Sequence, residues 1–302
     1  MNNLIINESV LTLSALQGYT ESFVDYLDVD DLTLKAYKCG INAFMNYLKS
    51  NDVKYPTRSD VIAFRDELRE NYSSNTTNSY MIAVRALFKY LEAHKLYDNI
   101  CVDIKGAKYD TTPRKEVLSL DQMKNIYSKL TDKREKALFG LMITTGLRVC
   151  EISTALIEDI RMYNNEAVLF VLGKKRDSKC EYVKLSEQVL KDIEEYVGNR
   201  AKGNIFTSTS PENYGQGLST TSLRKIVKTI LKRNGIDKDT VSCHSLRRSF
   251  AVVSYETGSS IYDIQQVLHH KSINTTTRYL KQVDRDKNKT EYNVANAILG
   301  GE

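Results

Sequence analysis

Apolar residues recur every three or four positions through much of the first hundred residues, and this spacing is the strongest constraint on the fold. The clearest segment carries them at Tyr37, Ile41, Phe44, Met45 and Leu48. Asp30 or Asp31 precedes that segment and can cap its first turn. Similar patterns predict helices from about residue 16, from Pro56–Thr57, and after a polar loop at 71–77. Four amphipathic helices joined by short loops predict a helical bundle.

The composition is that of a globular protein with room for two domains. Hydrophobic residues make up 41% of the 302 positions and charged residues 27%. No apolar run is long enough to span a bilayer, and the first residues lack the pattern of a signal peptide. The five cysteines are scattered without a CxxC pair, which argues against a disulfide framework or a zinc site. We therefore expect a reducing, cytoplasmic compartment.

The helical pattern breaks in a polar, basic stretch that carries Lys108, Arg114 and Lys115. We predict that residues 106–117 are a linker between a helical domain at 1–105 and a second domain at 118–302. The net charge of the chain is only +5, so the distribution of basic residues matters more than their number. The charges of the linker are either solvated or lie along a phosphate backbone, and the sequence leaves both alternatives open.

The second domain is predicted to be helical with one β-hairpin. A buried helix at 133–145 should end at Gly146, a residue suited to a left-handed cap. The apolar, β-branched segment 167–172 predicts a strand, and 181–185 predicts the strand that returns beside it. Further helices are expected at 186–200 and 219–234. The fold class is therefore mainly α with a small antiparallel β-sheet.

Three of the four histidines fall in one short region that also carries arginines and ends near Tyr279. His244 and Arg247 stand three residues apart, so a helix places both on one face. Imidazole and guanidinium groups together suit a phosphate, and a tyrosine can act as its nucleophile. The alternative is a basic surface helix followed by an aromatic core residue.

Two further basic residues stand next to predicted turns. Arg148 follows Gly146 closely and has Glu151 three residues later, a spacing at which a carboxylate can orient the guanidinium. Taken alone, this pair is better explained as a surface ion pair worth roughly 0.2–0.5 kcal/mol. Lys174 lies in the basic turn of the hairpin, where a solvated lysine is the simplest interpretation.

The order of these motifs along the chain is informative. Thr-Gly-Leu-Arg-x-x-Glu, a strand followed by Gly-Lys, His-x-Leu-Arg, Leu-His-His and Thr-x-Arg-Tyr occur in succession. This ordered set resembles the tyrosine recombinases (the integrase, Xer and Cre-like enzymes) over nearly the whole chain. The resemblance implies an N-terminal four-helix core-binding domain and a C-terminal tyrosine-recombinase catalytic domain.

The resemblance implies a role for each motif residue. Arg148, Lys174, His244, Arg247 and His270 would be catalytic, Glu151 would support Arg148, and Tyr279 would be the nucleophile. Neighbouring residues compete for three of these roles, namely Arg248, His269 and Lys175. His269 also occupies the position at which the family usually has glycine.

The resemblance further implies the reaction and its partners. Tyr279 would form a 3′-phosphotyrosyl link without metal, cofactor or ATP, and strands would be exchanged through a Holliday junction. A homo-tetramer would act on double-stranded DNA with inverted-repeat core sites, with or without an accessory protein, at the nucleoid in the cytoplasm. The final apolar helix around Val294, Ile298 and Leu299 would dock on a neighbouring protomer, and packing on its own domain is the alternative. Xer-like dimer resolution and integration or excision of a mobile element both remain open.

DNA contacts are predicted on the fourth helix and in the linker, with an ordinary solvated surface as the alternative. The candidates are Thr76, Asn78, Arg85, Lys89, Lys108, Arg114 and Lys115. Two other functions are compatible with the same motifs. One is a type IB topoisomerase-like enzyme that relaxes DNA, and the other is a DNA-binding relative with an inactive site.

Overall fold

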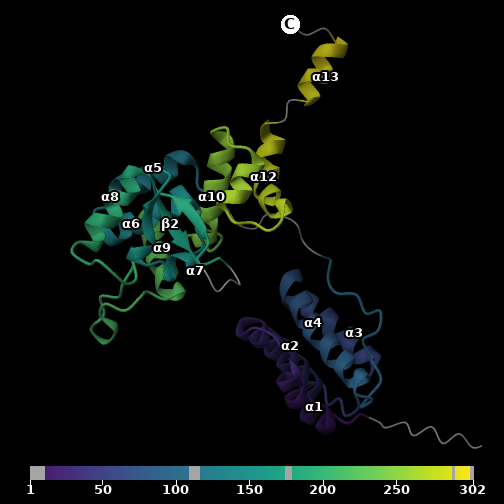
Figure 1. Cartoon of the computed structure of the whole chain (residues 1–302). Coiled ribbons are helices and arrows are strands. Elements are labelled where there is room, and N and C mark those ends of the chain that lie inside the picture. The colour runs from purple at the N-terminus through teal and green to yellow at the C-terminus, as the bar shows by residue number, and fades with distance from the viewer. Residues whose placement is uncertain (1–10, 109–115, 174–178, 288–289, 300–302) are drawn as a thin grey trace, which may run out of the picture. The chain divides into compact units, whose positions relative to one another are not determined.

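The computed structural model describes residues 11–108, 116–173, 179–287 and 290–299 (Figure 1). The chain divides into two compact units, Met1–Thr112 and Pro113–Glu302. Secondary structure is mainly helical with one small antiparallel sheet, so the predicted fold class is confirmed. No helix in the described ranges has the length and apolar character needed to cross a membrane.

The described part of the first unit contains four helices. They are α1 (Leu13–Tyr26), α2 (Asp31–Ser50), α3 (Arg58–Asn71) and α4 (Ser74–Ala93). Asp30 caps α2, as expected, because its carboxylate accepts a hydrogen bond from the amide of Thr33 at 2.9 Å. The prediction of a loop over 71–77 is wrong for its second half, because Ser73 caps α4 and residues 74–77 are helical. Polar residues in the first turn of a helix resemble a loop in sequence.

Helices α2 and α4 make the most extensive contact of this unit. Gly40 permits their close approach, because a Cβ atom at this position would lie 2.8 Å from the Cβ of Ala83. Phe44 fills the interior beside Phe64 and Phe88, at ring-centroid distances of 5.1 and 6.2 Å. The apolar spacing in the sequence therefore corresponds to one continuous core.

The second unit combines helices with the sheet. Its helices are α5 (Leu120–Lys129), α6 (Lys133–Thr145), α7 (Val149–Ser153), α8 (Glu187–Val197), α9 (Thr220–Arg233), α10 (Cys243–Glu256), α11 (Ile261–Val267), α12 (Ile273–Lys287) and α13 (Thr290–Leu299). Two short 3-10 helices are η1 (Ile157–Asp159) and η2 (Pro211–Asn213). The centre of the unit is α6, whose residues Ala137 to Met142 are all buried. The predicted buried helix is thus confirmed.

Three antiparallel strands form the sheet in the order β1-β2-β3. They are β1 (Ile160–Tyr163), β2 (Glu166–Val171) and β3 (Glu181–Lys184). Leu169 pairs with Val183 on β3 and with Ile160 on β1. The sequence did not predict β1, because its four residues are half-buried or exposed and lack an apolar pattern. Strand β3 lies at one edge of the sheet.

Candidate active site

The turn after α6 is the first element of the site. Gly146 ends the helix with φ of +62°, as predicted for a left-handed cap. A Cβ atom there would lie 2.5 Å from the ring of Phe250 and 2.8 Å from Leu268, so both the backbone and the surroundings require glycine. Two residues later, Arg148 stands immediately before α7 as its N-cap residue.

Glu151 holds Arg148 through two hydrogen bonds. Its carboxylate accepts from the backbone amide of Arg148 at 2.6 Å and from the guanidinium Nη1 at 2.7 Å. The Glu151 side chain is only 1% exposed, whereas that of Arg148 is 25% exposed. A surface ion pair does not have this geometry. Glu151 is a buried carboxylate that orients a partly exposed guanidinium.

Arg247 of α10 is held by main-chain carbonyls from two distant turns. Its Nη1 donates to Gly146 O at 2.7 Å, and its Nη2 donates to Leu268 O. The side chain is 2% exposed, and Nε has no hydrogen-bond partner among the described residues. Burial and the nearby charge of Arg148 lower the pKa of Arg247 to about 10, so it stays protonated at neutral pH. A buried cation with an unused donor is suited to binding an anion.

Tyr279 of α12 lies against two histidines. Its Oη is 3.0 Å from His244 Nε2, within hydrogen-bonding distance. The ring of His244 meets that of Tyr279 edge-on at a centroid distance of 5.8 Å, and the ring of His270 does so at 5.6 Å. Tyr279 is therefore a phenol with an adjacent group that can take its proton.

His270 is a buried neighbour of these residues. Its Nδ1 lies 2.8 Å from Thr276 Oγ1. Burial, and then the positive charges of Arg247 and Arg148, lower the pKa of His270 to about 3. The ring is therefore neutral near pH 7 and can donate one hydrogen bond without adding charge.

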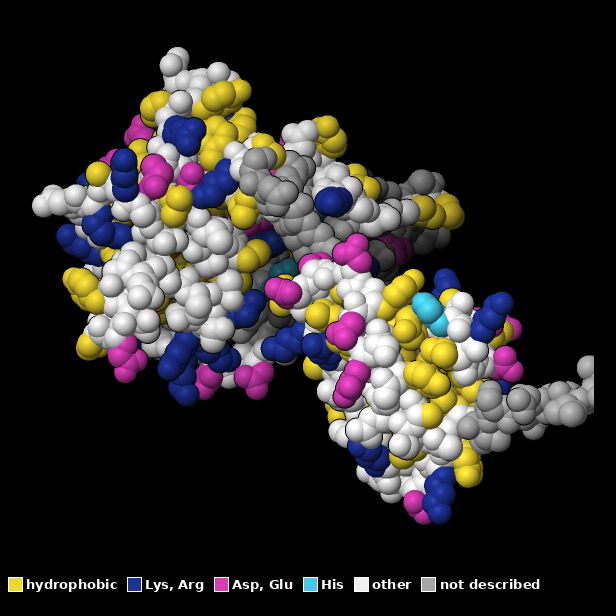
Figure 2. Space-filling view, turned by 60° about the horizontal axis from the view of Figure 1, so that its bottom comes forward, with side chains coloured by type: hydrophobic (Ala, Val, Ile, Leu, Met, Phe, Trp, Pro, Cys, Tyr) yellow, Lys and Arg dark blue, Asp and Glu magenta, His cyan; other side chains and the backbone are white. Residues whose placement is uncertain are grey.

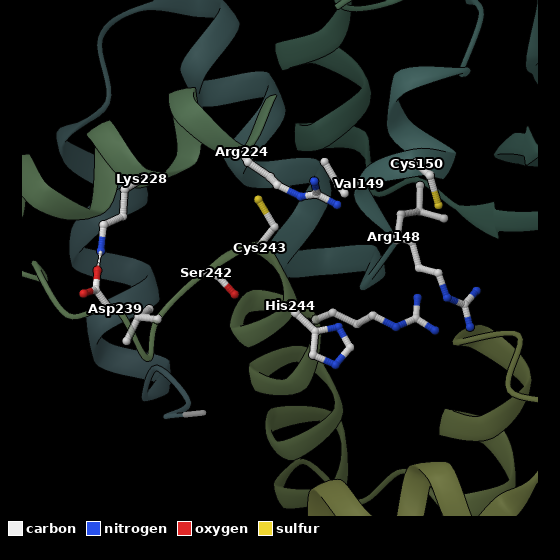
Figure 3. A pocket seen from close by; sticks show the side chains of 12 residues that line it. Arg148, Val149, Cys150, Arg224, Lys228, Asp239, Ser242, Cys243 and His244 are labelled. Atoms are coloured by element: carbon white, nitrogen blue, oxygen red, sulfur yellow. Dashed lines mark ion pairs between the residues drawn. The ribbon is translucent and has the colours of Figure 1, made fainter. Parts of the chain in front are cut away.

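A cavity of about 610 Å³ lies beside these groups, lined by Arg148, His244 and Arg247. Figure 3 shows His244 and Arg148 directed toward the same space. Arg224 and Lys228 of α9 also line it, and the sequence reasoning missed them. They stand four residues apart on one helix face, a basic spacing that could have identified them.

In two of the three pairs of neighbouring residues that compete for one role, the two side chains have different surroundings. Arg247 lines the cavity, whereas Arg248 is not among its lining residues. The ring of His270 packs on Tyr279, whereas the ring of His269 faces strand β3. Lys174 and Lys175 lie outside the described residues, as do Arg114 and Lys115 of the predicted linker.

The predicted DNA contacts on α4 differ in their environment. Asn78 is 5% exposed, and its amide donates to Ala107 O and accepts from Ala107 N at 3.0 and 2.9 Å. Asn78 therefore holds residue 107 on its own unit, and its side chain is not available to a ligand. Arg85 is half-buried and donates to Met81 O. Thr76 is half-buried, and its backbone amide donates to Ser73 Oγ at 3.3 Å.

Lys89 and Lys108 are both exposed. On the face shown in Figure 2, lysine and arginine side chains are interspersed with acidic and hydrophobic ones. The structure thus reduces the candidates of this unit without testing DNA binding. In the parts of the chain that the structure describes, no cluster of three or more His, Cys, Asp or Glu residues has the arrangement of a metal site.

Two family models match the chain. The model described as phage integrase family matches residues 116–285, and the model of the phage integrase N-terminal SAM-like domain matches residues 10–95. Together they account for most of both compact units.

Curated relatives and solved structures agree with this match. The tyrosine recombinase XerD of Listeria monocytogenes is 27% identical over 281 residues, which cover 86% of this chain and 92% of that protein. The tyrosine recombinase XerA of Pyrococcus horikoshii is 28% identical over 288 residues, covering 93% and 95%.

Two structures of protein–DNA complexes share the fold. The XerH site-specific recombinase bound to its palindromic difH substrate, in a post-cleavage complex, has a TM-score of 0.68 and 21% identity, covering 94% of this chain and 84% of that one. A lambda integrase dimer bound to a COC′ core site has a TM-score of 0.70 and 18% identity, covering 89% and 77%.

Proposed function

The chain belongs to the phage integrase family and is a tyrosine-type site-specific recombinase, and we propose that Tyr279 is the nucleophile with which it cuts and rejoins double-stranded DNA. The observation that carries this proposal is the contact of 3.0 Å between Tyr279 Oη and His244 Nε2. That contact lies next to two arginines that are positioned to bind a phosphate.

In the proposed cleavage step the Oη of Tyr279 attacks the phosphorus of the scissile phosphodiester. A new O–P bond forms, the bond from phosphorus to the 5′ oxygen breaks, and the proton of Tyr279 passes to His244 Nε2. The product is a 3′-phosphotyrosyl link. Attack on that link by a 5′ hydroxyl reverses the step, so rejoining needs no ATP.

Arg148 and Arg247 stabilise the charge that builds on the non-bridging oxygens. Each is held in place before the substrate arrives, Arg148 by Glu151 and Arg247 by the carbonyls of Gly146 and Leu268. Donors that are preorganised in this way typically stabilise a transition state by about 2.7–4 kcal/mol each. His270 supplies a neutral donor beside them. For the proton that the departing 5′ oxygen needs, we propose Lys174 on the strength of its motif.

The assembly is proposed to be a homo-tetramer that joins two inverted-repeat sites and passes through a Holliday junction. Exposed apolar side chains on α13 support this, since Tyr292 and Ile298 are 73% and 74% exposed. Such side chains suit docking on a neighbouring protomer. Lys89 and Lys108 are the proposed DNA contacts of the first unit, and residues 106–117 are the proposed linker. Integration or excision of a mobile element and resolution of dimers both fit this chemistry.

The experiment is covalent trapping on a suicide DNA substrate that is nicked next to the cleavage point. We expect the wild-type protein to form an adduct that survives denaturant at one defined sequence. Tyr279→Phe should bind the same DNA and form no adduct. Tyr262→Phe is the matched control, because it removes the hydroxyl of an exposed tyrosine in the same unit. An adduct that persists in Tyr279→Phe would contradict the assignment, and trapping without sequence preference would contradict site-specific action.

A further inference from the structure

His269 has a backbone conformation that side chains rarely adopt. Its φ is +49°, in the left-handed region that favours glycine. The backbone is also fixed on both sides of the residue, because His269 N donates to Gln266 O at 2.9 Å and His269 O accepts from Arg148 Nη2 at 3.4 Å. The loop that contains His269 therefore contacts a catalytic arginine directly.

The ring of His269 faces strand β3 with both of its nitrogens. Nε2 lies 3.4 Å from Tyr182 O, within hydrogen-bonding distance, and Nδ1 lies 3.2 Å from the carboxylate of Glu181 without forming a hydrogen bond to it. The side chains of His269 and Glu181 are 9% and 20% exposed, whereas the contact with Tyr182 O lies at an exposed edge of the sheet. Glycine would fit the backbone but could make neither contact.

The register of the sheet explains why Tyr182 is available. Leu185 N donates to Ala167 O at 2.8 Å, which makes that pair hydrogen-bonded. Hydrogen-bonded and non-hydrogen-bonded pairs alternate in an antiparallel ladder, so Val183 and Glu181 bond to β2 while Tyr182 does not. The carbonyl of Tyr182 therefore points away from β2 at the sheet edge, and His269 meets it there.

We propose that His269 is a positioning residue whose imidazole ties the edge strand β3 to the loop that holds Arg148. Strands β2 and β3 precede and follow Lys174 in the sequence, so we expect loss of the tie to slow the proton transfer proposed for Lys174. The catalytic part of the inference rests on the proposed function of Lys174 as the proton donor to the 5′ oxygen. The structural part rests only on the contacts of His269 with Glu181 and Tyr182.

The catalytic part is tested with two suicide substrates. One has the ordinary 5′ oxygen, and the other has sulfur in its place, which leaves as a thiolate and needs no proton because thiols are far more acidic than alcohols. We expect His269→Gly to cleave the oxygen substrate at least about tenfold more slowly. This loss would be part of the roughly 10²–10⁴-fold rate acceleration that a positioned acid contributes. Cleavage of the sulfur substrate should be unchanged. Equal losses on both substrates, or no loss on either, would overturn the proposal.

His269→Asn tests the same contact with a conservative replacement. Asparagine tolerates the left-handed backbone, and its amide can donate toward Glu181. We expect cleavage of the oxygen substrate to recover in part relative to His269→Gly. If His269→Asn is as slow as His269→Gly, the ring acts by some means other than its contacts with Glu181 and Tyr182.

The structural part is tested by hydrogen exchange on the free protein, without any DNA. His269→Gly and Glu181→Gln should speed exchange in a peptide covering residues 179–185 and leave α6 unchanged. Glu212→Gln is the matched control, since it removes an exposed carboxylate of the same unit that lies outside strand β3. Unchanged exchange in β3 would overturn the tie even if activity fell. A wild-type protein that forms no adduct would contradict the proposed function instead. The exchange result would still show whether His269 holds β3 in place.

Discussion

The catalytic cavity and the predicted DNA-binding side of α4 both carry polar residues, but these residues are held differently. In the cavity, Nη1 and Nη2 of Arg247 donate to main-chain carbonyls, and its Nε has no partner among the described residues. On α4, the side chain of Asn78 both donates to and accepts from Ala107. A functional side chain is positioned with donors to spare, whereas a structural one has its groups occupied.

The largest expected effect comes from replacing a donor of the cavity. Arg247→Lys keeps the charge but loses the planar guanidinium that bonds Gly146 and Leu268 at once. We expect cleavage to slow by about 10²–10³-fold, as for other preorganised donors. DNA binding should change only a few-fold, measured by gel shift beside single-turnover cleavage. The control is Arg233→Lys, which alters a surface ion pair with Glu135. Equal losses in binding and cleavage would contradict a role for Arg247 in the transition state.

Replacing the structural residue should have the opposite signature. Asn78→Ala leaves both backbone groups of Ala107 without their partner, and buried unpaired groups cost about 1–3 kcal/mol. We expect the free energy of unfolding to fall by that amount in a denaturant titration. Single-turnover cleavage at saturating protein should stay as in the wild type. A normal stability combined with weaker DNA binding would instead return Asn78 to the DNA contacts.

The sequence predicts the cavity through pairs that are close in the chain. Arg148 and Glu151 are three residues apart, as are His244 and Arg247, and helical geometry brings each pair together. It does not predict that Gly146 and Leu268 hold Arg247, because those carbonyls come from turns that only the tertiary fold brings together. The sequence also does not predict the left-handed backbone of His269, because that conformation favours glycine and a histidine gives no local sign of it.

The fold shows the same division between local and tertiary information. Apolar spacing predicts α2 and α6. Helix α2 buries residues at helical intervals, and α6 buries a continuous run. It misses β1, whose pairing with β2 depends on the sheet rather than on its own four residues. It also gives no sign that the side chain of Asn78, near the start of α4, bonds the backbone of Ala107.

A smaller effect concerns the pH dependence of stability, and it tests whether the cavity keeps His270 neutral beside the two arginines. The pKa of His270 is about 3 in the folded chain, below its ordinary 6.5, because of burial and the nearby arginines. Below pH 6.5 His270 binds a proton in the unfolded chain but not in the folded chain, so the free energy of unfolding falls as pH decreases toward 3. His270→Gln lacks this titration. Thermal unfolding from pH 7 to pH 4 should show a steeper loss in the wild type, and identical slopes would contradict it.

The smallest expected effect is on the exposed side of α4. Lys89 is exposed, so Lys89→Ala should leave the free energy of unfolding within about 0.5 kcal/mol of the wild type. If Lys89 contacts a phosphate, the variant releases one counterion fewer on binding, and the slope of log affinity against log salt falls by about one. Glu92→Gln on the same helix should not reduce that slope. Because both changes are at the surface, an unchanged salt slope in Lys89→Ala would mean that this side of α4 is only solvated, and that DNA contacts of the first unit lie elsewhere.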